Sequence, residues 1–101
     1  MSKLVSDEQW VWVVVRDPGG NEQFLGQRDE DKGISFIPIF LSKDDAERGL
    51  SALPLEPGHK YEVQAIMFDD LCQRAADNGF MLFVVNGSGQ VLEKIKPESS
   101  L

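Results

Sequence analysis

The chain has 101 residues, 42% of them hydrophobic and 27% charged, and its 17 acidic and 10 basic side chains give a net charge of −7. This length and composition predict one ordinary globular domain that can bury a core without disulfides. The negative charge, with no cluster of Lys or Arg, argues against binding to nucleic acid or to an anionic membrane surface.

Two short polar tails, residues 1–9 and 96–101, flank a predicted domain over residues 10–95, and we expect both tails to be flexible. The first tail, MSKLVSDEQ, lacks the apolar core of a signal peptide, and no apolar stretch is long enough to cross a membrane. Cys72 is the only cysteine and has no partner for an internal disulfide. We therefore expect a cytoplasmic protein.

The first half of the domain predicts three strands. Residues 10–15, WVWVVV, are β-branched or aromatic and apolar on both faces, so this strand is expected to be buried on both sides. The turn RDPGGN leads to a weaker strand, EQFLGQ, and QRDEDKG leads to a third, ISFIPIF. Pro38 cannot donate to a ladder, which predicts an edge or a bulge in this part of the third strand.

A helix is predicted directly after the third strand, in SKDDAERGL. Ser42 stands three residues before Asp45, the spacing of a capping box, and Asp44 and Asp45 oppose the positive end of the helix dipole. The apolar stripe of this helix is Ala46, Leu50 and Leu53, and Pro54 ends it. The two carboxylates are thus explained by the start of a helix.

The second half predicts a strand at YEVQAI, a second helix, a strand at FMLFVV, a loop at NGSG and a last strand at QVLEKI. The second helix ends at Asn78 and Gly79. Its apolar face is Phe68, Leu71, Cys72, Ala75 and Ala76. The order β-β-β-α-β-α-β-β predicts an α+β domain with two helices on a mostly antiparallel sheet of five to six strands, in which parallel pairing occurs only across the helical crossovers.

No pattern in the chain predicts a catalytic, cofactor or metal site, and we expect none of the three. His59 lies in the turn PGHKY without a second histidine or cysteine at ligand spacing, and Cys72 points towards the core in acidic surroundings. The alternative interpretation is a small-molecule-binding or minor hydrolytic domain that uses Asp44, Asp45 and His59.

Trp10 and Trp12 are two residues apart on the first strand and so share one face. Core packing is the ordinary explanation and an interface patch is the other. If both helices cover one face of the sheet, the other keeps an exposed apolar patch that a second copy or a partner would cover, whereas one helix on each face needs no dimer. The leading hypothesis is a non-enzymatic protein-interaction module, a homodimer or a partner-binding domain. Its interface candidates are Trp10, Trp12, Phe24 and Phe36.

Residues 34–87 carry a family resemblance. IPIF precedes SKDDAERGL, and the pattern I-x-F-x-x-L-C-x-x-A-x-x-x-G over residues 66–79 precedes an apolar strand that ends in VNGSG. In these features the chain resembles the N-terminal domain of SseB-like bacterial proteins and a related cyanobacterial and plant domain of unknown function. The resemblance implies a small α+β fold without assigned chemistry and transfers no active-site residues.

Overall fold

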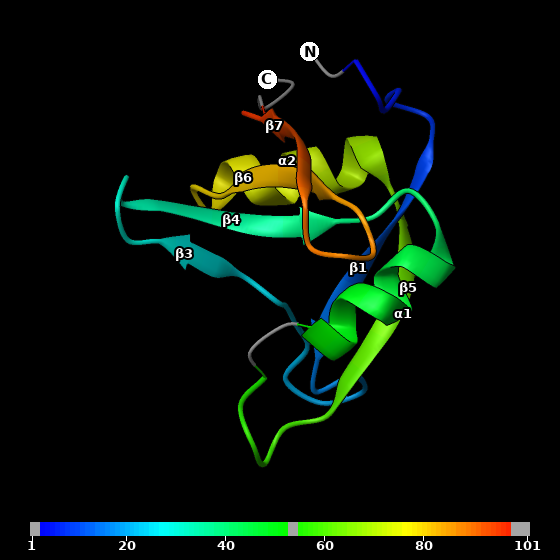
Figure 1. Cartoon of the computed structure of the whole chain (residues 1–101), viewed down its shortest axis with the longest axis vertical. Coiled ribbons are helices and arrows are strands. Elements are labelled where there is room, and N and C mark those ends of the chain that lie inside the picture. Colours follow the sequence, from blue (N-terminus) through cyan, green and yellow to red (C-terminus); the bar gives the residue numbers. More distant parts are fainter. Residues whose placement is uncertain (1–2, 53–54, 98–101) are drawn as a thin grey trace.

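The structure is a computed structural model that describes residues 3–52 and 55–97. Seven strands and two helices lie in these ranges, and Figure 1 shows how they are arranged. They are β1 (Trp10–Arg16), β2 (Gln23–Phe24), β3 (Gln27–Asp29), β4 (Ile34–Ile39), α1 (Lys43–Ala52), β5 (Tyr61–Met67), α2 (Phe68–Asp77), β6 (Met81–Val85) and β7 (Val91–Ile95). The α+β class and the order of elements are confirmed, with more strands than the five to six expected.

The strands form two sheets with the orders β2-β1-β5 and β3-β4-β6-β7. Every pair is antiparallel except β4 with β6, which is parallel and spans the crossover through α1, β5 and α2. The parallel pair therefore lies where the sequence allowed one. The two sheets are joined where Trp12 and Phe40 exchange backbone hydrogen bonds of 2.9 Å in both directions.

The additional strand is β3, whose residues Gln27–Asp29 begin at the end of the predicted strand over residues 22–27 and continue into QRDEDKG, which the sequence predicts as a turn. After Phe24 the Leu25 N–H still donates to the Val14 carbonyl at 2.8 Å, and the chain then leaves the first sheet to start β3 in the second. The change of sheet occurs at Gly26, where a Cβ atom would lie 2.9 Å from the Phe80 ring. Close packing against Phe80 therefore marks the break between β2 and β3.

Pro38 lies on an open side of β4, as predicted. β3 pairs with residues 34–36 of β4, and the Trp12–Phe40 bridge begins only at residue 40. Pro38 falls between these two partners and pairs with Phe83 of β6 on the other side. The missing N–H therefore interrupts no ladder.

The two helices cover opposite faces of the sheets, which Figure 1 shows with α1 in front of β1 and β5 and with α2 behind β6. The α2-side core contains Val5, Val11, Val13, Val15, Ile37, Ile39, Phe68, Leu71, Ala75, Leu82, Val84 and Ile95. The α1-side core contains Val14, Phe40, Ala46, Phe83 and Val85. Successive residues of β1 alternate between these cores, so β1 needs both faces apolar. One helix on each face is the arrangement that by itself requires no dimer.

Both helices begin and end largely as the sequence predicts. The Ser42 hydroxyl accepts a hydrogen bond from the Asp45 N–H at 3.2 Å, which confirms the cap of α1. Gly79 follows the end of α2 with a positive φ of 76°, in the left-handed region. In α1 Ala46 is buried and Leu50 half-buried, whereas Leu53 and Pro54 lie outside the described residues. In α2 Phe68, Leu71 and Ala75 are buried, and Cys72 and Ala76 are half-buried.

Residues 3–9, expected as a tail, make specific contacts with the domain. Val5 is only 5% exposed and belongs to the α2-side core. The Gln9 carbonyl accepts the Phe68 N–H at 2.9 Å, and the Asp7 carbonyl accepts the Asp69 N–H at 3.0 Å. These two carbonyls satisfy amides at the start of α2, so the folded part of the chain begins before residue 10. Of the predicted C-terminal tail, residues 98–101 lie outside the described residues.

Candidate interaction surface

One end of the first sheet presents an apolar face that its own helix leaves open. On this face Trp10 lies opposite Met67, and Trp12 lies opposite Ala65. Trp10 is 57% exposed, Ala65 is also exposed, and Trp12 and Met67 are half-buried. These four residues, the tryptophan face, contain both tryptophans that the sequence selected. Ala65 and Met67 were missed because only the β1–β5 register identifies them.

Helix α1 covers the other end of the same sheet face. Tyr61 and Val63 pack against the α1-side core, which includes Ala46 of α1, whereas Ala65 and Met67 do not. Trp12 is an intermediate case, because its ring packs against this core and Lys43 Nζ lies 6.0 Å from the ring centroid. Along β5, the half of this face at Tyr61 and Val63 is therefore covered, and the half at Ala65 and Met67 is open.

Strand β5 is also the last strand of its sheet among the described residues. None of its residues is buried, in contrast to β1, where four of seven are buried. Its sequence, YEVQAIM, contains no proline and no lysine, and Glu62 is its only charged residue. Natural edge strands are commonly protected by proline, by lysine and other charged residues, by bulges or by covering segments. The outer edge of β5 is therefore suited to pair with another strand.

The other two interface candidates lie elsewhere. Phe24 pairs with Val15 and packs against the α2-side core, on the opposite face from the tryptophans. Phe36 is stacked on Phe83, with ring centroids 4.1 Å apart and planes inclined by 12°, on the α1 side of the second sheet. The four candidates therefore do not form one patch, and only Trp10 and Trp12 are brought together.

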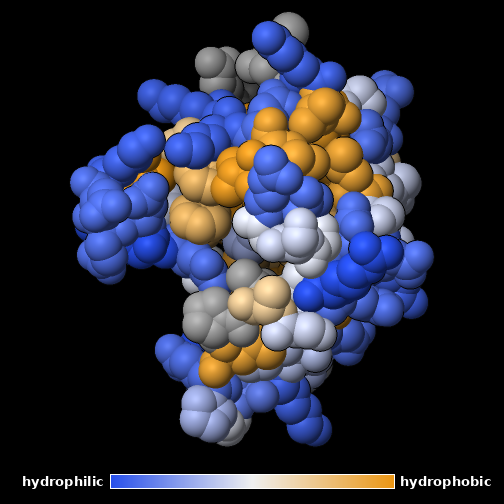
Figure 2. Space-filling model, viewed as in Figure 1, coloured by the Kyte–Doolittle hydropathy of each residue, from blue (hydrophilic) through white to orange (hydrophobic). Residues whose placement is uncertain are grey.

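A second apolar region lies on β7. Val91 is 41% exposed and Leu92 is 46% exposed. Figure 2 shows apolar surface in the upper part of the molecule, over this strand, interrupted by hydrophilic side chains. The long side chain of Lys94 lies over Phe83, with Nζ 5.3 Å from the ring centroid, and so covers part of this sheet face.

The hydrolytic alternative combines Asp44, Asp45 and His59, but His59 forms its contacts with other residues. Its Nδ1 atom lies 2.8 Å from Oδ2 of Asp17, and its Nε2 atom lies 3.8 Å from Oε2 of Glu56. Asp44 and Asp45 occupy the first turn of α1. The hydrogen bond from His59, followed by that from the Lys60 N–H, lowers the pKa of Asp17. The histidine thus stabilises the turn around Asp17.

Cys72 is half-buried in α2. Burial raises the pKa of its thiol to about 11, and the negative charges of Asp7 and Asp69 add to this effect. A thiol of this kind is mostly protonated near neutral pH and is a poor nucleophile. Within residues 3–52 and 55–97 no group of three or more His, Cys, Asp or Glu side chains could hold a metal ion. No helix in these ranges is long and apolar enough to cross a membrane.

The chain matches no protein family, no curated protein and no solved structure. The resemblance to SseB-like domains therefore stays a prediction.

Proposed function

We propose that the protein is a non-enzymatic interaction module that associates with a second copy of itself through the outer edge of β5 and the tryptophan face. Two features support this proposal together: an edge strand that has no proline or lysine and only one charged residue, and exposed tryptophan beside it. A cytoplasmic location is part of the proposal, supported by the single cysteine.

Backbone hydrogen bonding supports pairing at this edge. The Asp17 N–H donates to the Lys60 carbonyl, and the Phe68 N–H donates to the Gln9 carbonyl. Even-numbered residues of this segment therefore direct their backbone groups towards β1, because these directions alternate along a strand. The residues with outward backbone groups are Tyr61, Val63, Ala65 and Met67. An extended strand is the natural partner for such a row.

A second copy of β5 fits this edge in an antiparallel register centred on Gln64. In this register Val63 pairs with the partner's Ala65, so outward groups meet outward groups. Glu62 lies opposite the partner's Ile66, and the two Gln64 residues lie opposite each other, so no like charges are directly opposed. The result is a symmetric contact of the kind that most homodimers use.

In the same register, the open half of this sheet face in one copy lies beside the half that α1 covers in the other copy. Met67, in the tryptophan face, comes to lie beside the partner's Tyr61, at the end of β5 that α1 covers. The partner's α1 is thereby brought towards the open end of the first copy. Apolar contact on this face would add to the backbone hydrogen bonds.

Sedimentation equilibrium over a concentration series tests the proposal, with circular dichroism as the check on folding. Ala65→Pro removes one outward N–H from each copy and no hydrogen bond to β1. At about 1 kcal/mol for each of the two lost bonds, the dissociation constant of the dimer should rise roughly thirtyfold. Trp10→Lys should also shift the equilibrium towards monomer, whereas the matched control Leu92→Lys, on β7, should leave it unchanged.

Two outcomes would contradict self-association through β5. A wild-type chain that stays monomeric at millimolar concentration would exclude a second copy as the partner and leave the edge to a strand of another protein. A dimer that resists Ala65→Pro but is lost in Leu92→Lys would assign the interface to β7. Since each copy carries a net charge of −7, added salt should strengthen a genuine dimer by screening repulsion.

A further inference from the structure

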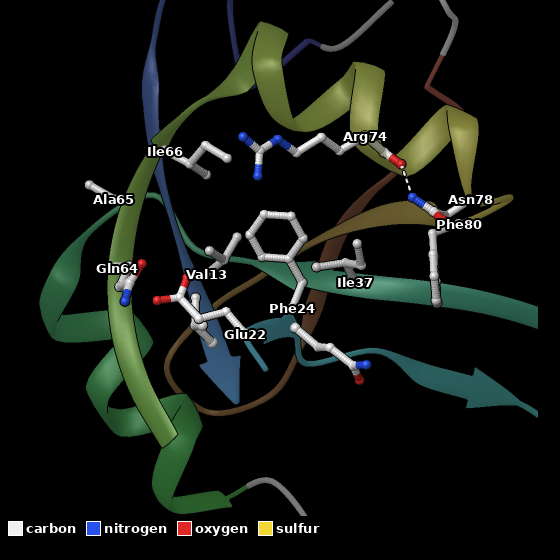
Figure 3. Close-up of a pocket in the computed structure, with 12 residues that line it drawn as sticks. Val13, Glu22, Phe24, Ile37, Gln64, Ala65, Ile66, Arg74, Asn78 and Phe80 are labelled. Atoms are coloured by element: carbon white, nitrogen blue, oxygen red, sulfur yellow. Dashed lines mark hydrogen bonds between the residues drawn. The ribbon is translucent and has the colours of Figure 1, made fainter. Parts of the chain in front are cut away.

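A cavity on the α2 side of the first sheet, the face opposite to the tryptophan face, has the chemistry of a ligand site. It has a volume of about 580 Å³, within the range of small-molecule sites, and lies between α2, the first sheet and β4. Its apolar surface includes Ile37, Ile66 and the rings of Phe24 and Phe80. Figure 3 shows Phe24 in the middle of this cavity, below the side chain of Arg74.

Arg74 supplies a positive charge at the cavity. The guanidinium carbon lies 5.9 Å from the Phe24 ring centroid, and Figure 3 shows the side chain extending from α2 across the cavity towards β5. The ion pairs of the described residues involve Arg28, Lys43 and His59 but not Arg74. In an acidic protein, an arginine without a carboxylate partner is available to an anion from solution.

Polar groups of a different kind line another part of the cavity. The Glu22 carboxylate accepts the Gly19 N–H at 2.7 Å, which fixes its position. Gln64 is half-buried, and no residue in the described ranges forms a hydrogen bond with its carboxamide. A hydrogen-bond donor on the ligand therefore has acceptors in Glu22 and Gln64.

We propose that this cavity binds a small, flat organic monoanion, with its carboxylate on Arg74 and its apolar ring against Phe24. The single arginine and the nearby Glu22 favour one negative charge over the several charges of a polyphosphate, because Glu22 and the acidic protein would repel the excess. The aromatic walls favour a planar body. The proposal does not rest on self-association, because the walls of this site lie on the α2 side of the first sheet, opposite the tryptophan face, although Gln64 and Ile66 also belong to the strand that pairs in the proposed dimer.

Indole-3-acetate is a suitable probe, and indole-3-acetamide is its neutral counterpart. Titrations of isotope-labelled protein followed by NMR should show saturable shifts at Ile66 and Phe80, with the acetate bound at least about tenfold more tightly than the amide. Arg74→Gln should abolish this preference. Arg48→Gln, which removes an arginine from α1, is the matched control and should preserve it.

Several outcomes would overturn the inference. One is an absence of saturable shifts at millimolar probe, and another is equal affinity for indole-3-acetate and indole-3-acetamide. A third is an equal loss of the preference for the acetate in Arg74→Gln and Arg48→Gln, which would indicate a general charge effect. Trp10→Lys should bind indole-3-acetate like the wild type, so failure of the dimer and failure of this site remain distinguishable. Thermal unfolding of each variant verifies that a lost signal does not come from a lost fold.

Discussion

Gly49 is the position at which the packing of α1 makes the sharpest prediction. It is buried in the helix, facing Phe40, and a Cβ atom added there would lie 2.5 Å from Cζ of the Phe40 ring and closer still to Cε1. Real Cβ atoms do not approach carbon so closely. Phe40 is only 1% exposed, and both its backbone N–H and its carbonyl are bonded to Trp12 at 2.9 Å. The ring therefore has little room to retreat.

Two opposing effects set the magnitude for Gly49→Ala. Replacing glycine by alanine inside a helix normally stabilises it by about 1 kcal/mol. Overpacking a closed core costs about 1–3 kcal/mol, and this site is at the high end because the Phe40 backbone is held on both sides. We expect a net loss of about 1–2 kcal/mol in the free energy of unfolding. In a domain of this size, that loss lowers the melting temperature by roughly 5–10 °C.

Urea denaturation followed by circular dichroism measures this loss. Ser51→Ala is the control, because Ser51 is exposed in the same helix and alanine there should be neutral or slightly stabilising. In a Phe40→Leu background the smaller side chain should remove most of the cost of Gly49→Ala. A Gly49→Ala protein more stable than the wild type would refute the close approach of α1 to Phe40.

Three smaller effects follow from other contacts. Ser42→Ala should lower the free energy of unfolding by about 1 kcal/mol through loss of the α1 cap. Asp44→Ala should leave self-association intact. Loss of association in a folded Asp44 variant would show that this carboxylate has a functional role. The Cys72 thiol, with its pKa raised to about 11, should react with a disulfide reagent far more slowly at about pH 8 in native than in denatured protein, and equal rates would contradict its placement. Since the folded state lowers the pKa of Asp17, its contact with His59 should stabilise the fold above the ordinary aspartate pKa near 3.9 and lose this effect as the pH falls through the lowered value. Asp17→Asn should therefore be less stable than the wild type at about pH 6, and thermal unfolding across pH should show this difference shrinking as the pH falls below the ordinary aspartate pKa.

The sequence could predict the elements because local chemistry determines them. The apolar runs of β1 and β6, the cap at Ser42 and the stop at Gly79 are each readable within a few residues. Strand periodicity likewise required Trp10 and Trp12 to share a face.

Features that depend on distant pairs were not readable. Phe24 lies on the opposite face from the tryptophans because its register with Val15 fixes its direction, and that register lies outside its own segment. The start of α2 is satisfied by the carbonyls of Asp7 and Gln9, and backbone acceptors leave no trace in residue type. Arg74 reads as an ordinary solvated charge on a helix until the fold brings it over Phe24.

The route of the chain explains why β5 remains an edge strand in a domain whose cores are otherwise covered. Helix α2 begins at Phe68, directly after Met67, and packs against the α2-side core rather than leading to a strand beside β5. Helix α1 covers the Tyr61 end of the other face and leaves the Met67 end open. Since each copy already has a core on both faces, its fold does not depend on a partner. The contact that remains is one strand edge and half a sheet face, smaller than the interfaces of obligate dimers. Self-association is therefore expected as a concentration-dependent equilibrium between folded monomers and a dimer.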